Sequence, residues 1–281
     1  MPHQDGRFKG HDGLELYQQC WLPERESAAV VVLVHGFIEH SGRYADVAKE
    51  LNRHGYAVYA LDLRGHGQSN GERVFVRSFD EFAADLDIFL QEVKRRESGK
   101  AIFLLGHSMG GTIAARLAVT RQPDVAGMVL SAPAVRVGKG VFPLLRRGAR
   151  LVSRLFPRLR VVRLGSGWIS RDPQVVADFR QDPLVFHEKF TVRIGAEILD
   201  AAQHLQDHAP SLRLPLLILQ GTADRIVDPT GSRLLHDRAG STDKTLRIYE
   251  GLYHDLLHEP EKEQVTANMT EWLDRRCVNK S

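Results

Sequence analysis

A serine stands between two glycines in the run Gly106–Gly110, which reads GHSMG. The apolar run AIFLL precedes it, and the helix-like stretch TIAARLAVTRQ follows it closely. Gly-x-Ser-x-Gly between a strand and a helix is typical of a nucleophile elbow, in which the serine occupies a strained turn. Glycines beside that turn avoid collisions with neighbouring backbone, and the helix N-terminus favours negative charge nearby. The pattern therefore predicts Ser108 as the nucleophile of an acyl transfer.

A serine hydroxyl becomes a good nucleophile only with a general base, and the base needs an orienting carboxylate. In folds with this elbow the chain order is serine, then acid, then histidine. Two acids follow the apolar run 216–219, namely Asp224 and Asp228. Asp228 precedes Pro229 and is typical of a helix cap, whereas Asp224 comes directly after the strand's turn. We therefore expect Asp224 to be the orienting acid.

Two histidines follow the last apolar run, at 245–249. His254 lies in the loop after that run, where the general base is expected, whereas His258 is predicted near the start of a C-terminal helix. Their spacing resembles the metal-binding pattern His-Glu-x-x-His, but Asp255 replaces the glutamate and the flanks do not indicate a long helix. We expect His254 to be the base, with no metal and no organic cofactor.

The loop after the apolar run Val30–Val34 reads HGFIEH. A loop at this position commonly supplies one backbone N–H of an oxyanion hole, and the residue after the nucleophile supplies the other. This places the donors at Phe37 and Met109. Glu39 and His40 either order the loop by hydrogen bonding or are solvated loop residues, and the sequence leaves both interpretations open.

Short apolar runs alternate with helix-like segments along most of the chain. This alternation predicts an α/β protein with a mostly parallel sheet covered by helices on both faces. The stretch Leu14–Trp21 alternates more like a strand exposed on one face, which favours an antiparallel start. The predicted buried strands are 30–34, 56–61, 101–105, 128–130, 216–219 and 245–249, and the predicted helices are 44–54, 79–96, 109–121 and 230–239.

The alternation stops between about residues 134 and 213 and then resumes. A structureless loop of that length is improbable in a compact domain. We therefore expect a core domain formed by residues 1–133 and 214–281, with residues 134–213 inserted as a helical cap, or lid, over one end of the sheet.

The segment Val141–Arg163 in this insertion combines apolar residues with arginines. The simpler interpretation is a cap helix that buries its apolar face against the core. The alternative is a basic amphipathic helix that lies on a membrane surface. The apolar residues are Phe142, Leu144, Leu145, Leu151, Val152, Leu155 and Phe156, and the arginines are Arg146, Arg147, Arg150, Arg154, Arg158, Arg160 and Arg163.

The composition is that of an ordinary globular protein, with 43% hydrophobic and 26% charged residues. A formal net charge of +3 is small for 281 residues and does not indicate a nucleic-acid partner. The first residues, MPHQDGRFKG, contain no apolar signal core, and no apolar run approaches the roughly 20 residues that span a bilayer. We expect a cytoplasmic enzyme, with peripheral membrane contact as the alternative that the cap raises.

Several motifs together resemble the monoacylglycerol lipase family. The resemblance implies the α/β-hydrolase fold with an eight-stranded sheet and a helical cap. Carried over by position, it also implies Ser108, Asp224 and His254 as catalytic residues and Phe37 and Met109 as oxyanion donors. The motifs are HGFIEHSGRY at 35–44, DLRGHGQSNG at 62–71, GHSMGG at 106–111, SRDPQVVADFRQDPLV at 170–185, QGTADRIVD at 220–228 and DKTLRIYEGLYH at 243–254.

This family implies hydrolysis of the ester bond of a monoacylglycerol to a fatty acid and glycerol. The same residues would also serve a lysophospholipase or a broad-specificity carboxylesterase, because the chemistry is shared. A ligand receptor on the same fold is the alternative outside the enzymes. The arginine-rich stretch matches no motif of the family, so acyl-chain length and the residues that contact glycerol stay unassigned.

Overall fold

The computed structural model describes residues 2–136 and 149–277, and eight strands of this part form one sheet in the order β1-β2-β4-β3-β5-β6-β9-β10. Only β2 runs antiparallel to its neighbours, and the other pairs are parallel. The mostly parallel sheet and the antiparallel start are therefore confirmed. The strands are β1 (His3–Lys9), β2 (Glu15–Trp21), β3 (Ala29–Val34), β4 (Tyr56–Leu61), β5 (Ala101–His107), β6 (Gly127–Ser131), β9 (Leu216–Gly221) and β10 (Lys244–Tyr249).

The edge strand β1 has no counterpart among the strands expected from the sequence. Its residues are mostly exposed, and Phe8 is the one buried side chain of the strand. A polar edge strand lacks the alternation of apolar and polar residues that predicts a strand. By contrast, every residue of β3 is buried, as expected for a strand covered on both faces. The prediction of a buried strand at 245–249 is wrong, because β10 is the other edge of the sheet and Tyr249 is its one buried residue.

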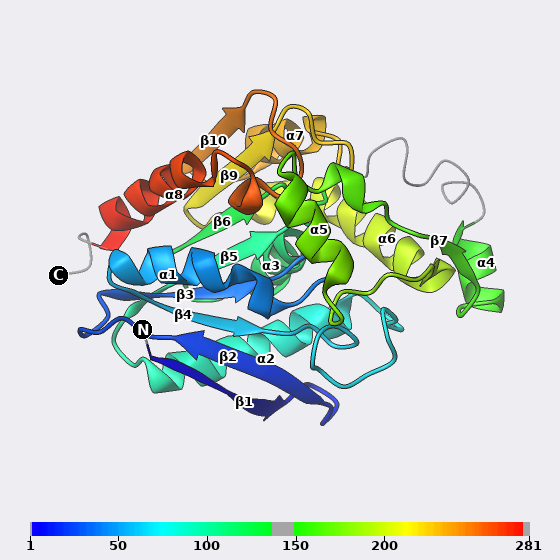
Figure 1. Ribbon diagram of the computed structural model, residues 1–281, viewed down its shortest axis with the longest axis horizontal. Coiled ribbons are helices and arrows are strands. Elements are labelled where there is room, and N and C mark those ends of the chain that lie inside the picture. Colours follow the sequence, from blue (N-terminus) through cyan, green and yellow to red (C-terminus); the bar gives the residue numbers. More distant parts are fainter. Residues whose placement is uncertain (1, 137–148, 278–281) are drawn as a thin grey trace.

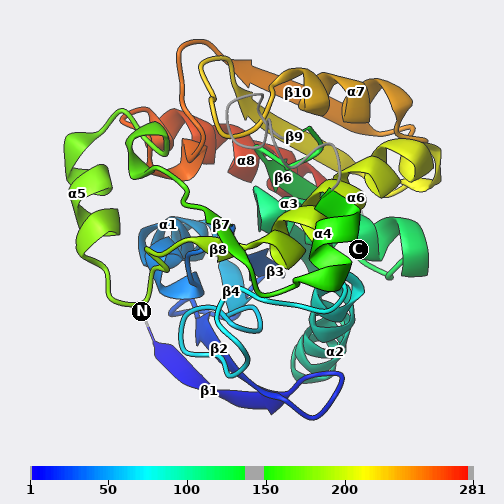
Figure 2. The ribbon, with the colours of Figure 1, turned by 90° about the vertical axis from the view of Figure 1, so that its right-hand side faces the viewer.

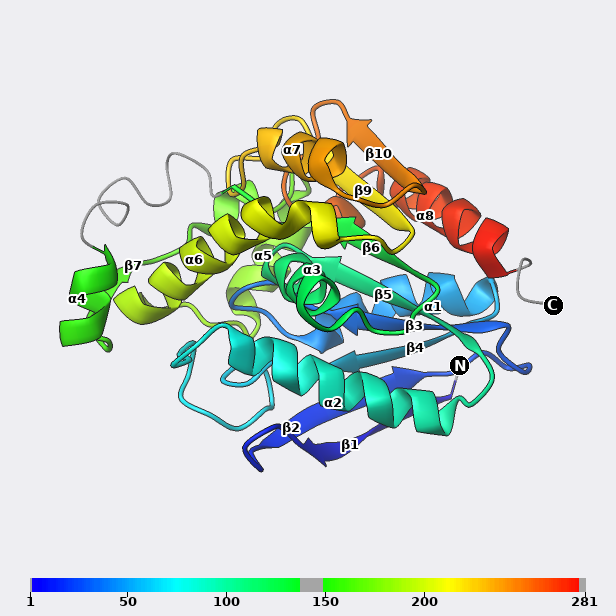
Figure 3. The same ribbon diagram turned by 180° about the vertical axis from the view of Figure 1, so that it is seen from behind.

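Helices cover both faces of the sheet, as predicted. The helices α1 (Ala45–Arg53) and α8 (Lys262–Cys277) lie on the face toward the viewer in Figure 1. The opposite face carries α2 (Asp80–Arg96), α3 (Met109–Arg121) and α7 (Thr230–Arg238), which Figure 3 shows from behind.

The segment between β6 and β9 lies over the carboxyl ends of the parallel strands (Figure 2). It contains a two-stranded antiparallel ribbon, β7–β8, that the sequence did not predict. Strands of three and two residues are too short to carry a periodic signal. The described elements are α4 (Ala149–Leu155), β7 (Arg160–Val162), α5 (Pro173–Gln181), β8 (Phe190–Thr191) and α6 (Val192–His208), with 3₁₀ turns at Ser166–Trp168 and Ala209–Ser211.

The described part of the arginine-rich segment leaves its apolar side chains in solvent. Leu151, Leu155 and Phe156 are 63%, 64% and 64% exposed. The expectation that these residues pack against the core is therefore wrong, and α4 has an exposed apolar face. The rest of this prediction lies outside the described residues. It concerns Phe142, Leu144, Leu145, Arg146, Arg147 and the side chain of Arg150.

Within residues 2–136 and 149–277, every helix is too short or too polar to cross a bilayer.

The segment that contains α5, residues 169–186, is hydrogen-bonded at both ends to loops of the core. At one end, the backbone N–H of Asp255 donates to the carbonyl of Ile169 at 2.8 Å. At the other end, the N–H of Phe186 donates to the carbonyl of Ile38 at 2.8 Å, and His40 Nε2 lies 2.8 Å from Asp182 Oδ2. The segment is thus bound to the two loops that carry the candidate base and the candidate oxyanion donor.

Candidate active site

Ser108 occupies the strained turn between β5 and α3. Its backbone has φ 52° and ψ −117°, a conformation that non-glycine residues rarely adopt. A Cβ at Gly110 would lie 2.2 Å from the Val34 carbonyl oxygen, and a Cβ at Gly106 would lie 2.6 Å from that of Gly110. Only glycine permits this close packing, so the two glycines fix the geometry around Ser108.

Three predicted site residues, far apart in the sequence, are joined by hydrogen bonds. His254 Nε2 lies 2.8 Å from Ser108 Oγ, and His254 Nδ1 lies 2.7 Å from Asp224 Oδ2. Because a carboxylate only accepts, Nδ1 donates to Asp224, and neutral Nε2 is left to accept the serine proton. All three side chains are buried. The arrangement allows proton transfer from Ser108 to an imidazole held in the required tautomer.

The surroundings of His254 raise its pKa above the ordinary value of 6.5. Burial by itself lowers the pKa, because it disfavours the imidazolium. The charge of Asp224 and its hydrogen bond outweigh burial, and Asp255 and Glu39 add to the effect. A more basic imidazole accepts the proton of Ser108 more readily, provided that it is neutral before the reaction.

We therefore expect kcat/KM to fall at acidic pH with a midpoint above the ordinary histidine pKa of about 6.5. Only neutral His254 can act as the base, and its neutral fraction falls as the pH drops through its raised pKa. The profile should be measured with an uncharged ester from about pH 5 to about pH 9. A midpoint well below the ordinary value would show that the base is not held beside an ionised carboxylate.

The two rejected alternatives have other partners in the structure. Asp228 Oδ1 accepts hydrogen bonds from the N–H and the hydroxyl of Thr230, the first residue of α7, although the N-cap position of that helix is Pro229 and not Asp228. His258 lies in the 3₁₀ turn Leu256–His258, and α8 begins only at Lys262. The Nδ1 and Nε2 atoms of His258 contact Asp255 Oδ1 and the Arg43 carbonyl at 2.8 and 2.9 Å.

The predicted oxyanion donors lie beside Ser108. Met109 is the first residue of α3, where a helix leaves backbone N–H groups without intrahelical acceptors. Phe37 lies in the loop after β3, and both residues line the same pocket as Ser108. This loop includes Ile38 with φ 62°, a strained conformation for a β-branched residue.

Glu39 orders this loop, which decides between the two interpretations that the sequence left open. Its Oε1 accepts from the Gly36 N–H at 2.6 Å and from the Tyr44 hydroxyl at 2.7 Å. Its Oε2 accepts from Arg43 Nε at 2.9 Å. Burial raises the pKa of Glu39, but the charge of Arg43 outweighs this and holds it below its ordinary value. An ionised glutamate therefore closes the turn around Phe37.

Arg43 joins the two loops of the site, a role that the sequence analysis did not assign. Besides Glu39 it contacts Asp255, with Arg43 Nη2 3.1 Å from Asp255 Oδ2. Asp255 directly follows His254, so the buried guanidinium links the loop of Phe37 to the loop of the base. Phe179 of α5 covers it, with the guanidinium carbon 4.8 Å from the ring centroid. Removing one partner of such a buried network leaves an uncompensated charge, which is strongly destabilising.

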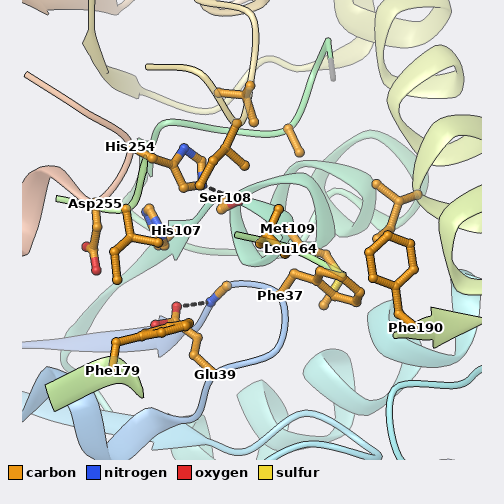
Figure 4. A pocket seen from close by; sticks show the side chains of 16 residues that line it. Phe37, Glu39, His107, Ser108, Met109, Leu164, Phe179, Phe190, His254 and Asp255 are labelled. Atoms are coloured by element: carbon orange, nitrogen blue, oxygen red, sulfur yellow. Dashed lines mark hydrogen bonds between the residues drawn. The ribbon is translucent and has the colours of Figure 1, made fainter. Parts of the chain in front are cut away.

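The pocket at Ser108 is polar on one side and apolar on the other (Figure 4). Glu39, His107 and Asp255 lie on one side of Ser108 in this view, and the second side leads past Phe37 to Phe190. The rings of Phe37 and Phe190 pack edge to face at 5.2 Å. Most of the apolar lining residues come from loops and from the inserted segment. Phe179, Ile226 and Val227 stand in motifs quoted above but were given no role there. The other apolar lining residues carried no motif: Ala134, Leu164, Ile169, Phe190 and Ile198.

Gln220 is a further residue that the sequence analysis passed over. It is fully buried near the end of β9, and its Nε2 lies 3.2 Å from Asp224 Oδ2. A single polar residue in the otherwise apolar run LLILQ was the signal that could have identified it.

The chain is similar to known proteins over most of its length. A family model described as serine aminopeptidase, S33, matches residues 25–261. The monoacylglycerol lipase of Mycolicibacterium smegmatis is 39% identical over 266 residues, which is 95% of each chain. The human monoglyceride lipase is 37% identical over 284 residues, covering 99% of this chain and 93% of the relative.

Among solved structures, the crystal structure of Paleococcus ferrophilus monoacylglycerol lipase is similar over 95% of this chain and 100% of its own. The TM-score is 0.85 and the sequence identity 34%. The high coverage on both sides shows that the likeness includes the segment between β6 and β9 as well as the sheet. The chain belongs to the serine aminopeptidase S33 family of α/β-hydrolases, and within it to the monoacylglycerol lipases.

Proposed function

We propose that this enzyme hydrolyses monoacylglycerols to a fatty acid and glycerol through an acyl intermediate on Ser108. One observation carries the proposal: Asp224, His254 and Ser108 form a hydrogen-bonded chain that ends in a pocket with an apolar side. Similar proteins from several organisms are named monoacylglycerol or monoglyceride lipases, which supports this substrate class over a lysophospholipid or a short-chain ester.

In the first half of the reaction, Ser108 Oγ attacks the ester carbonyl while His254 Nε2 takes the hydroxyl proton. Asp224 stabilises the imidazolium that forms. The backbone N–H groups of Phe37 and Met109 bind the oxyanion, and each such donor is worth about 10²–10³ in rate. The tetrahedral intermediate collapses when His254 gives its proton to the departing glycerol oxygen, which leaves the fatty acyl group on Ser108.

In the second half, water enters and loses a proton to His254 Nε2 as its oxygen attacks the acyl carbonyl. The same two N–H groups bind the second oxyanion. Collapse returns the proton from His254 to Ser108 Oγ and releases the fatty acid. The overall reaction consumes the ester and one water molecule and regenerates the free enzyme.

The two sides of the pocket suggest how the substrate lies. The acyl chain would follow the apolar side between Phe37 and Phe190, because burial of CH₂ groups is favourable by about 0.8 kcal/mol each. The glycerol would face Glu39, His107 and Asp255, whose polar atoms can bind hydroxyl groups. A bulkier alcohol would meet Phe179, which covers Arg43 on that side.

A panel of esters tests the substrate class. The panel consists of long-chain mono-, di- and triacylglycerols, lysophosphatidylcholine and short-chain aryl esters. We expect the highest kcat/KM on monoacylglycerol, because one alkyl chain and a small polar alcohol match the two sides of the pocket. Preference for short aryl esters without turnover of monoacylglycerol would contradict the proposal, and binding without any turnover would indicate a receptor.

We also propose that residues 134–213 act as a cap unit on a core formed by residues 1–133 and 214–281, and that the cap contacts lipid surfaces. Monoacylglycerol is an amphiphile that partitions into lipid. The exposed side chains of Leu151, Leu155 and Phe156 belong to the same inserted segment as Leu164, which lines the pocket. Arg154 and Arg163 are exposed nearby, and cationic side chains favour an anionic lipid surface.

Sedimentation with anionic vesicles tests this contact. Leu155→Ser/Phe156→Ser should lower the bound fraction, because each serine removes apolar area that would enter the lipid. A matched control is Glu24→Ser/Arg25→Ser, in an exposed loop before β3 at the opposite end of the parallel strands. Equal partitioning of the wild type and of both double variants would remove membrane contact from the proposed function.

A further inference from the structure

A buried glutamine near the end of the parallel strand β9 has no role in the proposed mechanism. Gln220 is fully buried on β9, and the four strand residues before it are leucine or isoleucine. An apolar side chain of similar volume would avoid the desolvation of an amide, which is unfavourable unless every polar atom is hydrogen-bonded. The bonds that Gln220 makes therefore indicate what it does.

All the hydrogen-bonding groups of the Gln220 amide have partners. Its Nε2 lies 3.2 Å from Asp224 Oδ2 and 3.1 Å from the Gly221 carbonyl oxygen. Its Oε1 lies 2.7 Å from Oγ of Ser232, a fully buried residue of α7. A carboxylate and a carbonyl can only accept, so the NH₂ group must face Asp224 and Gly221. The Ser232 hydroxyl then donates to Oε1 and holds the amide in this orientation.

The second observation is the full set of bonds on Asp224. Oδ1 accepts from the backbone N–H groups of Ile226 and Val227 at 2.8 and 3.0 Å. Oδ2 accepts from His254 and from Gln220. A carboxylate has about four lone-pair sites, and these four donors fill them. The backbone fixes one oxygen and Gln220 fixes the other, so the carboxylate plane is set even when the imidazole moves.

We propose that Gln220, oriented by Ser232, is a positioning residue that holds the Asp224 carboxylate in place against His254. The proposal rests on the role proposed above for Asp224. It extends the hydrogen-bonded chain by two members, so that it runs from Ser232 on α7 through β9 to Ser108. Gln220 acts through Asp224 and does not touch the reacting atoms.

The hydrogen bond from Gln220 also stabilises the negative charge of Asp224. A hydrogen bond to one oxygen of a carboxylate stabilises the anion and leaves less of its charge to favour the neighbouring imidazolium. Loss of Gln220 should therefore do two things: reduce activity through a less well placed carboxylate, and move the acidic limb of the pH profile upward. A residue that only fills space would cause the first effect without the second.

The test measures kcat/KM against pH with p-nitrophenyl butyrate. Gln220→Met keeps the length of the side chain and removes its polar atoms. We expect kcat/KM at the plateau to fall by about 10-fold, since a lost hydrogen bond to a charged group is worth about that factor. We expect the acidic limb to rise by about half a pH unit. Gln220→Glu should move the limb further upward, because it places a second carboxyl group beside Asp224.

Two matched controls separate positioning from general damage to the fold. Gln18→Met alters another buried glutamine, on β2, whose Nε2 donates to Glu92 away from Ser108. Ser241→Ala is the control for Ser232→Ala, because Ser241 is a buried serine bonded only to Asp243 among the described contacts. We expect both controls to keep the wild-type limb, and Ser232→Ala to move it upward.

An unmoved limb in Gln220→Met and Ser232→Ala would overturn the proposal, even if activity fell. If Gln220→Met does not fold, Ser232→Ala alone decides by the same criterion. Because the probe is an aryl ester, the result is independent of whether monoacylglycerol is the natural substrate. Failure of the proposed function would appear differently, as full activity of Ser108→Ala on the same ester.

Discussion

Ser108→Ala is expected to lower kcat on a monoacylglycerol by about 10⁶-fold, the loss seen when the nucleophile of a serine hydrolase is removed. The reason is that, in the described part of the chain, the hydroxyl bonded to His254 Nε2 is that of Ser108, at 2.8 Å. Binding of the substrate should persist, because the apolar side of the pocket is unchanged. The measurement is release of glycerol under saturating substrate, with the two proteins at equal concentration.

The thermal stability of Ser108→Ala shows whether the loss of activity comes from damage to the fold. Ser108 has a strained backbone with positive φ, and alanine has the same Cβ, so the substitution neither relieves nor adds strain. The midpoint of thermal unfolding should therefore change little. A variant that keeps a tenth or more of the wild-type kcat would show that another residue is the nucleophile.

Asp224→Asn is expected to lower kcat by about 10⁴-fold at neutral pH, the effect of the same change in a serine protease triad. An asparagine can place its NH₂ group against His254 Nδ1, which then becomes an acceptor, and the ring proton moves to Nε2. A protonated Nε2 cannot take the proton of Ser108. Without the charge of Asp224, which raises the pKa of His254, the acidic limb should also move downward.

Asp228→Asn is the matched control, because the sequence offered both carboxylates as candidates. Asp228 accepts a hydrogen bond from the Thr230 N–H at the start of α7, and an asparagine oxygen can accept the same bond. We expect its kcat to stay within about twofold of wild type, since no contact of Asp228 reaches the imidazole. A large loss in Asp228→Asn with a small loss in Asp224→Asn would reverse the two assignments.

Much of the fold follows from local sequence patterns. A strand that is buried along its whole length appears as a continuous β-branched and leucine-rich run, as β3 does. The glycines around Ser108 are required by contacts that no side chain could tolerate, which is why a five-residue motif located the turn. Chain order and position after a strand then sufficed to choose Asp224 and His254, and the structure brings both within hydrogen-bond distance of their partners.

The remaining features depend on contacts between distant segments. The role of Arg43 depends on the folded structure, because Arg43 contacts both Glu39, four residues away in the sequence, and Asp255, more than two hundred residues away. The exposed face of α4 could not be foreseen either, since an amphipathic pattern is the same whether the apolar face meets a core or solvent. Gln220 was visible only as a polar residue in an apolar strand, and its partner Ser232 lies on another element.

Titration with a fluorophosphonate tests the central claim most directly, because the number of labelled serines and the remaining activity are measured in the same sample. The account predicts one phosphonyl group per chain, attached to the peptide that contains Ser108. It also predicts that turnover of monoacylglycerol falls in proportion to the labelled fraction and reaches zero at complete labelling. Turnover that survives complete labelling of Ser108, or a label confined to another residue, would contradict it.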